Sequence, residues 1–111
     1  MAKFLVLYRS NVSAAEQMSS GTPEQMKAGM DAWMAWAQQT GSSLTDMGSP
    51  LGDTKAVGDG VAPSPGYVGG YSFLEADSLD AAVKLVDSHP HLMTPGGAAV
   101  EVHELLPMPG R

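Results

Sequence analysis

The feature that most constrains the fold is an uninterrupted apolar run close to the N-terminus, from Phe4 to Tyr8. Successive side chains of a β-strand point to opposite faces, so Phe4 and Val6 would share one face and Leu5 and Leu7 the other. A strand that is apolar on both faces is typical of the middle of a sheet covered on both sides. Any fold for this chain must therefore hide both faces of its first strand.

Helical and strand patterns alternate along the rest of the chain. Thr22-Pro23-Glu24-Gln25 combines a capping box with a proline at the first helical position, which predicts a helix that Gly41 ends. A second helix is predicted from Asp77-Ser78 to the residue before Pro90. Strands are predicted at 3–9, 43–47, 67–75 and 98–106, and loops at 10–21 and 51–66, with a short extended piece around Lys55–Val57.

The first helix carries its apolar residues on one stripe, made of Met26, Met30, Trp33 and Ala37 with Met34 beside them. This spacing predicts a face packed against the core, with Trp36 at its edge. Gly29 inside the helix costs about 1 kcal/mol relative to alanine. We expect close packing against a strand to explain it.

The order strand, helix, strand, strand, helix, strand predicts a single domain over residues 1–111, of the α+β class with the ferredoxin-like split β-α-β pattern. Right-handed crossovers place both helices on one face of a four-stranded antiparallel sheet. The opposite face would expose Leu5 and Leu7, so we expect a homodimer that packs two such faces together and buries on the order of 2,000 Å².

Composition narrows the classes of partner. Twelve acidic and six basic residues give a net charge of −6, which argues against nucleic acid and anionic lipid as partners. The absence of cysteine excludes disulfides and thiolate chemistry. No apolar run approaches a membrane span, and the N-terminus lacks the shape of a signal peptide, so we expect a cytoplasmic protein without membrane contact.

Known cofactor and metal motifs are missing from the sequence. It contains no dinucleotide fingerprint, P-loop, serine elbow or HExxH motif, so no cofactor is expected. His89, His91 and His103 could in principle supply three nitrogen ligands to a zinc ion. Their spacing does not bring His103 to the other two, and we expect no metal site.

Two blocks of sequence resemble the YCII-related, or DGPF-type, proteins. The more specific block runs from Gly69 to Val83 and continues with His89-Pro90-His91-Leu92, Gly96-Gly97 and Val100-Glu101-Val102. The earlier block comprises Trp33-x-x-Trp36, Gly41 and Gly48-x-Pro50-Leu51, and the motif that names one branch is altered to Asp59-Gly60-Val61-Ala62. The resemblance covers nearly the whole chain. It implies a dimeric α/β barrel with a small-molecule pocket between sheet and helices.

The resemblance also implies a pair of catalytic positions. Some YCII-like proteins are thought to use a histidine and an aspartate for acid–base chemistry, such as removing a leaving group from a ring. The family's histidine falls by spacing on Gln25 and its aspartate on His89. The catalytic hypothesis therefore makes His89 the base and Gln25 the group that orients substrate or water, in a cofactor-free lyase or dehydrochlorinase-like enzyme. The alternative is a non-catalytic ligand-binding or interaction module that lacks the pair.

Four further residues are candidate ligand contacts: His91, His103, Glu101 and Arg9. His91 could lie at the mouth of the pocket as a second imidazole. Arg9, Glu101 and His103 alternate with apolar strand residues, so they could orient a polar ligand or form cross-strand pairs, and we favour the pairs. A structural explanation of His89 is also open, in which its cationic form meets the C-terminal end of the second helix.

Overall fold

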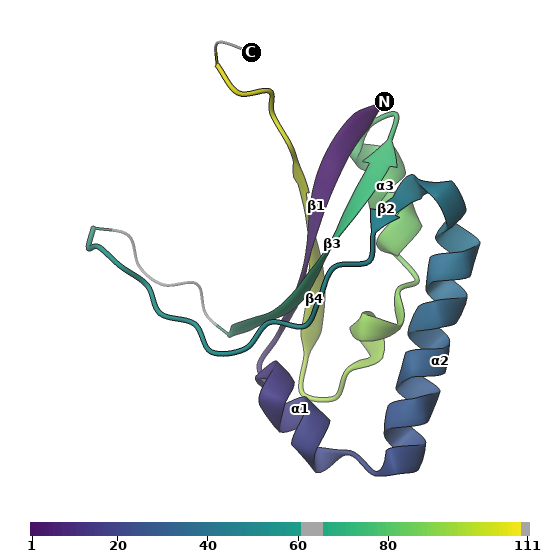
Figure 1. Cartoon of the computed structure of the whole chain (residues 1–111), viewed down its shortest axis with the longest axis vertical. Helices are drawn as coiled ribbons and strands as arrows, with labels where there is room; N and C mark the ends of the chain where they lie inside the picture. The colour runs from purple at the N-terminus through teal and green to yellow at the C-terminus, as the bar shows by residue number, and fades with distance from the viewer. Residues whose placement is uncertain (61–65, 110–111) are drawn as a thin grey trace.

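The computed structural model describes residues 1–60 and 66–109 as one α+β domain (Figure 1). Its elements in chain order are β1 (Ala2–Ser10), α1 (Ala14–Ser20), α2 (Pro23–Thr40), the 3-10 turn η1 (Gly41–Ser43), β2 (Leu44–Asp46), β3 (Tyr67–Ala76), α3 (Leu79–Val86), the 3-10 turn η2 (Pro90–Met93) and β4 (Ala98–Glu104).

The strands form one antiparallel sheet in the order β2-β3-β1-β4. The apolar first strand lies in the interior of this sheet, with β3 on one side and β4 on the other, as its composition predicts. Helices α2 and α3 lie on the same side of the sheet (Figure 1). This arrangement is compatible with the predicted ferredoxin-like fold.

The alternation along β1 separates the two faces of the sheet. Phe4, Val6 and Tyr8 are buried beneath the helices, whereas Leu5 and Leu7 are only half-buried on the open face. The core on the covered face continues through Leu74, Ala76, Ala82, Val86 and Trp36. A single chain therefore hides one face of its first strand.

The start and end of α2 follow the sequence signals. The Thr22 hydroxyl accepts a hydrogen bond from the Gln25 amide, and the Gln25 side chain accepts one from the Thr22 amide at 3.0 Å. Gly41 ends the helix with a φ of 63°, a backbone conformation that favours glycine. Similarly, the Ser78 hydroxyl caps α3 by accepting from the Ala81 amide.

Residues 10–21 contain a helix that the loop prediction missed. Ser13 caps α1 by accepting from the Glu16 amide at 3.2 Å. The helix has only 7 residues, too few for a repeating apolar stripe. The available signal was the local Ser13-x-x-Glu16 pattern of a capping box.

The apolar stripe of α2 is packed only in part. Met26, Met30 and Met34 are exposed, Trp33 is half-buried, and Trp36 is buried at 4% exposure. The prediction that the methionines face a packed core is therefore wrong, and Trp36 belongs to the core instead of its edge. Helix periodicity locates the side directed at the sheet but does not give the distance between helix and sheet.

The connection from β2 to β3 begins with a bridge between Pro50 and Gly70. Residues 51–60 then run away from the body as an exposed segment, and the extended piece expected around Lys55–Val57 is not a strand (Figure 1). Val61 and Ala62 of the altered DGPF motif lie outside the described residues. The predicted bulge at Gly69-Gly70 is present, because the β1–β3 register shifts where Tyr8 faces Gly70 and Arg9 faces Val68.

The second predicted helix ends earlier than Pro90. Helix α3 stops at Val86, and His89 instead occupies the cap position of η2. None of the helices in the described part of the chain combines the length and apolar character that crossing a membrane requires.

Candidate functional site

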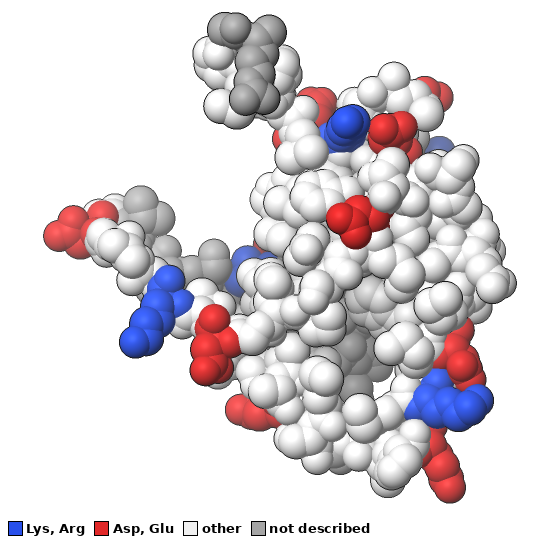
Figure 2. Space-filling view, viewed as in Figure 1, with Lys and Arg blue, Asp and Glu red and all other residues white. Residues whose placement is uncertain are grey.

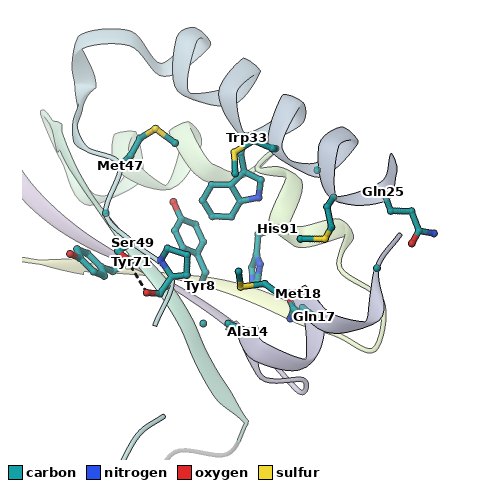
Figure 3. Close-up of a pocket in the computed structure, with 18 residues that line it drawn as sticks. Tyr8, Ala14, Gln17, Met18, Gln25, Trp33, Met47, Ser49, Tyr71 and His91 are labelled. Atoms are coloured by element: carbon teal, nitrogen blue, oxygen red, sulfur yellow. Dashed lines mark hydrogen bonds between the residues drawn. The ribbon is translucent and has the colours of Figure 1, made fainter. Parts of the chain in front are cut away.

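A cavity of about 480 Å³ lies on the helix-covered side of the sheet, between α1, the N-terminal half of α2 and the start of β3. Figure 2 shows the hollow between α1 and α2, with uncharged residues along most of its margin and charged residues on its right. Figure 3 shows Trp33 above it, Tyr8 and His91 within it and Met18 below. The volume falls within the usual range for small-molecule sites.

Glycines leave room for this cavity. Gly69 and Gly70 face it from β3 and Gly29 faces it from α2. A Cβ atom added at Gly29 would meet nothing within 4 Å, so the expected close packing against a strand is wrong. Gly48 has a different role, because its φ of 75° and a Cβ contact of 1.7 Å to the Tyr71 carbonyl oxygen admit only glycine.

The lining of the cavity is apolar and uncharged. It contains no Asp, Glu, Lys or Arg among the described residues, and its large side chains include aromatic rings and thioethers. Methionine side chains are flexible and polarisable, so they adapt to ligands of irregular shape. The methionines are Met18, Met26, Met30 and Met47.

Tyr8 forms part of the cavity wall through its ring, and its hydroxyl is held by a neighbour. The Ser72 hydroxyl donates its single hydrogen to the Met47 carbonyl at 2.7 Å. The 2.8 Å contact between the Tyr8 and Ser72 oxygens therefore has Tyr8 as donor. Burial raises the pKa of the Tyr8 phenol, and the hydrogen bond to Ser72 offsets part of this effect.

His91 reaches the cavity from η2. Its Nε2 lies 2.8 Å from the carbonyl oxygen of Arg9, which can only accept, so Nε2 carries the hydrogen and Nδ1 of the neutral ring is left with a lone pair. The rest of the side chain is buried, and the ring packs against Tyr8 at 5.5 Å between centroids. The protein thus fixes both the position and the tautomer of this imidazole.

His89 lies beneath the cavity and does not line it. It is 1% exposed, and its ring packs within 4.3–4.7 Å of the ring centroids of Tyr8, Trp33 and Trp36. Nδ1 accepts from the His91 amide at 2.9 Å, so the neutral ring carries its hydrogen on Nε2. Among the described residues, this Nε2 is the one buried side-chain polar atom without a hydrogen-bond partner.

This environment overturns the idea of a cationic His89 at a helix end. Burial, together with the nearby His91, lowers the pKa of His89 to about 4. The ring is neutral near pH 7. It packs as an aromatic core residue and uses one nitrogen to cap η2.

The two positions of the catalytic hypothesis are not brought together. Gln25 belongs to the cavity rim, but its side chain caps α2 and points away from the centre (Figure 3). His89 is enclosed by aromatic rings. The imidazole that meets the cavity is that of His91, two residues further on.

The remaining candidates lie on the opposite face of the sheet. Arg9 donates to Glu101 at 3.0 Å, and His103 lies 3.2 Å from the other Glu101 oxygen. The hydrogen bond with His103 lowers the pKa of the Glu101 carboxyl, burial opposes this effect, and the contacts with Arg9 lower the pKa further. The Arg9–Glu101 pair is a cross-strand contact of the kind we favoured from the sequence, whereas Glu101 and His103 are neighbours on β4.

His103 is also separated by the sheet from His89 and His91. Within residues 1–60 and 66–109, no group of three or more His, Cys, Asp or Glu side chains could hold a metal ion.

Sequence reasoning did not assign Tyr8, Ser72 or Trp33 to the site. A signal existed for Tyr8, because it shares the face of Phe4 and Val6, which the helices cover. No comparable signal marked Ser72, whose partner Met47 lies 25 residues away in the chain.

Comparison with known proteins gives no further guide to the site. No protein-family model matches the chain, and no curated protein matches it either.

Proposed function

We propose that this protein binds a small, uncharged and mostly apolar organic molecule in the cavity between α1, α2 and the sheet. The observation that carries the proposal is a cavity of about 480 Å³ whose described lining has no charged side chain. Such a lining would leave a charged ligand without a counter-ion, and burial of an unpaired charge is costly. Aromatic rings and methionines instead favour apolar ligands.

Titration with indane, a neutral hydrocarbon of two fused rings, tests this proposal. Indane should raise the unfolding temperature, because a ligand that binds only the folded state stabilises it. Gly29→Leu, which fills the cavity from α2, should remove this shift. Ala35→Leu is the matched control, since Ala35 is exposed and does not line the cavity.

The proposal fails if neither indane nor the hydroxylated and keto derivatives of indane stabilise the wild-type protein. An equal shift in the wild-type protein and Gly29→Leu would place binding elsewhere and would also contradict it.

The position of His91 favours a second candidate function, acid–base catalysis without a cofactor. The hydrogen bond from Nε2 to Arg9 leaves Nδ1 as the basic atom. A general base must present such a lone pair to the bound molecule. The role assigned to His89 in the sequence hypothesis therefore passes to His91, and Gln25 is left as a rim residue.

Proton abstraction can be measured without knowing the natural substrate. In D₂O, 2-indanone exchanges the hydrogens next to its carbonyl when a base removes a proton and a deuteron returns. We expect saturable acceleration of this exchange, observed by NMR, and its loss in His91→Gln. Gln25→Ala should retain it. Exchange no faster than in an imidazole buffer of equal concentration would dismiss catalysis and leave the binding function intact.

We further propose that the chain forms a homodimer through the open face of its sheet, as in the dimeric α/β barrels. Leu5 and Leu7 of β1 pair there with Phe73 and Tyr71 of β3, and the two rings contact each other at 5.8 Å. Four large apolar side chains on one open face favour burial against a second copy.

Sedimentation at micromolar concentration tests the dimer. We expect the wild-type protein to sediment as a dimer and Leu7→Lys as a monomer. Val83→Lys, which changes an exposed apolar residue of α3, should remain dimeric. A monomeric wild-type protein would overturn the proposal.

Membership of the YCII-related family and a cytoplasmic location belong to the same proposal. The antiparallel sheet order β2-β3-β1-β4 supports the first, because it is compatible with the ferredoxin-like fold that the resemblance implies. The binding function stands in either case, since it depends on the cavity alone.

A further inference from the structure

The cavity has two polar atoms whose hydrogen-bonding capacity is unused. Within the described part of the chain, Trp33 Nε1–H and His91 Nδ1 make no hydrogen bond. The one buried side-chain polar atom without a partner there is His89 Nε2, so the Trp33 and His91 nitrogens are not fully buried. Both nitrogens therefore keep some exposed surface, and both residues line the cavity. Trp33 Nε1–H can only donate, and His91 Nδ1 in the neutral ring can only accept.

The other polar side chains directed at the cavity already donate their hydrogens, and the Tyr71 side chain lies on the open face beside Leu7. The Tyr8 hydroxyl donates to Ser72, and the Ser49 hydroxyl donates to the Pro50 carbonyl at 3.0 Å. The Gln17 amide nitrogen donates to Ser10 Oγ at 2.9 Å and to the Val12 carbonyl at 3.2 Å. Gln25 is turned toward the outside. Trp33 Nε1–H therefore remains as an unused donor, and His91 Nδ1 remains as an acceptor that makes no other hydrogen bond.

The donor and the acceptor lie in one part of the cavity. The rings of Trp33 and His91 both pack edge-on against the Tyr8 ring, with centroid distances of 4.7 and 5.5 Å. In Figure 3 the nitrogen of the Trp33 indole is on the side of its ring that faces His91. A polar group bound next to Tyr8 would thus meet both.

We propose that the natural ligand is a neutral, largely apolar molecule carrying a hydroxyl group, which donates to His91 Nδ1 and accepts from Trp33 Nε1–H. This inference rests on the binding function proposed above and names its ligand class. A hydroxyl is both donor and acceptor, whereas a ketone or an ether only accepts. The apolar remainder of the ligand packs among the methionines.

A set of probes with one carbon skeleton tests the inference. Indane has no polar group, 2-indanone has an acceptor, and 2-indanol has both an acceptor and a donor. All three are uncharged near pH 7. Binding is followed in the ¹⁵N-labelled protein by NMR, through the indole N–H signals of its two tryptophans.

The expected result concerns both affinity and the identity of the signal that moves. The protein should bind 2-indanol about 3- to 10-fold more tightly than 2-indanone, the range for one neutral hydrogen bond. The Trp33 signal should shift with 2-indanol. The Trp36 signal should stay in place, because its N–H already donates to the Leu85 carbonyl at 2.8 Å.

A variant isolates the donor. Trp33→Phe keeps an aromatic ring but removes the N–H, so it should weaken 2-indanol binding about 3- to 10-fold more than it weakens indane binding, which reports the change in the apolar wall alone. If 2-indanone binds the wild-type protein as tightly as 2-indanol, the hydroxyl assignment is wrong while the binding function survives. If none of the three probes binds, both proposals fail.

Discussion

The helix-covered side of the sheet has two ends that differ in packing. At the closed end, defined by Phe4, Val6, Leu74, Val86 and Trp36, all five side chains are at most 4% exposed. The open end surrounds the cavity, and its helix residues Met26 and Met30 are 45% and 61% exposed. One helix, α2, contributes to both ends.

The difference arises from what lies opposite each half of α2. Its C-terminal half meets α3, and the Trp36 indole donates to the Leu85 carbonyl at 2.8 Å. Beyond Val86 the chain continues as the 3-10 turn η2, which is too short to fill the space opposite the N-terminal half. The packed core and the cavity therefore lie at opposite ends of the same helix.

The largest test of this difference compares one truncation at each end. Trp36→Ala should lower the free energy of unfolding by about 3–5 kcal/mol, since it leaves a cavity in the closed end and an unpaired Leu85 carbonyl. Met30→Ala should lower it by less than about 1 kcal/mol, because Met30 is already exposed. Urea unfolding measures both values. Equal losses would show that the two ends are packed alike.

A smaller effect is expected from His89, which lies between the two ends. Its pKa is about 4 in the folded protein and near 6.5 in the unfolded chain, so the unfolded state binds the proton more readily. The contribution of the neutral His89 ring to the free energy of unfolding is fully present above pH 6.5 and is lost as the pH falls toward 4. The loss amounts to about 3 kcal/mol.

Carboxylates also titrate in this range, so the measurement is the difference between wild-type protein and His89→Asn. Asparagine keeps a side-chain acceptor for the His91 amide but does not titrate. Urea unfolding at pH 7 and pH 4 should show a smaller loss in the variant, by about 3 kcal/mol. The same loss in both proteins would place His89 outside the buried aromatic cluster.

The two ends also differ in how far the sequence predicts them. The closed end follows from local patterns: the alternation of β1 places Phe4 and Val6 on one face, and Thr22 and Ser78 mark the starts of the helices. These signals act over a few residues and depend on backbone geometry. They predict the strands, both long helices and the side of the sheet that the helices cover.

The open end depends on distances that no local pattern encodes. The stripe containing Met26 and Met30 would look the same whether α2 touches the sheet or stands away from it. The placement of His91 instead of His89 at the cavity has a similar cause, because the earlier end of α3 makes His89 the cap of η2 and puts His91 inside that turn. The sequence therefore predicts the position of a candidate site residue to within one helical turn, but it does not predict which way its side chain points.

The smallest effect concerns Gly29, in the half of α2 that borders the cavity. Gly29→Ala should raise the free energy of unfolding by up to about 1 kcal/mol, because alanine is the better helix former and its Cβ meets no atom within 4 Å. Urea unfolding measures the gain. Indane affinity should be unchanged in Gly29→Ala and lost in Gly29→Leu. This difference would show that the methyl group of alanine leaves enough room for the ligand. A destabilised Gly29→Ala would mean that α2 lies closer to β3 than the open end allows, and the distinction between the two ends would then disappear.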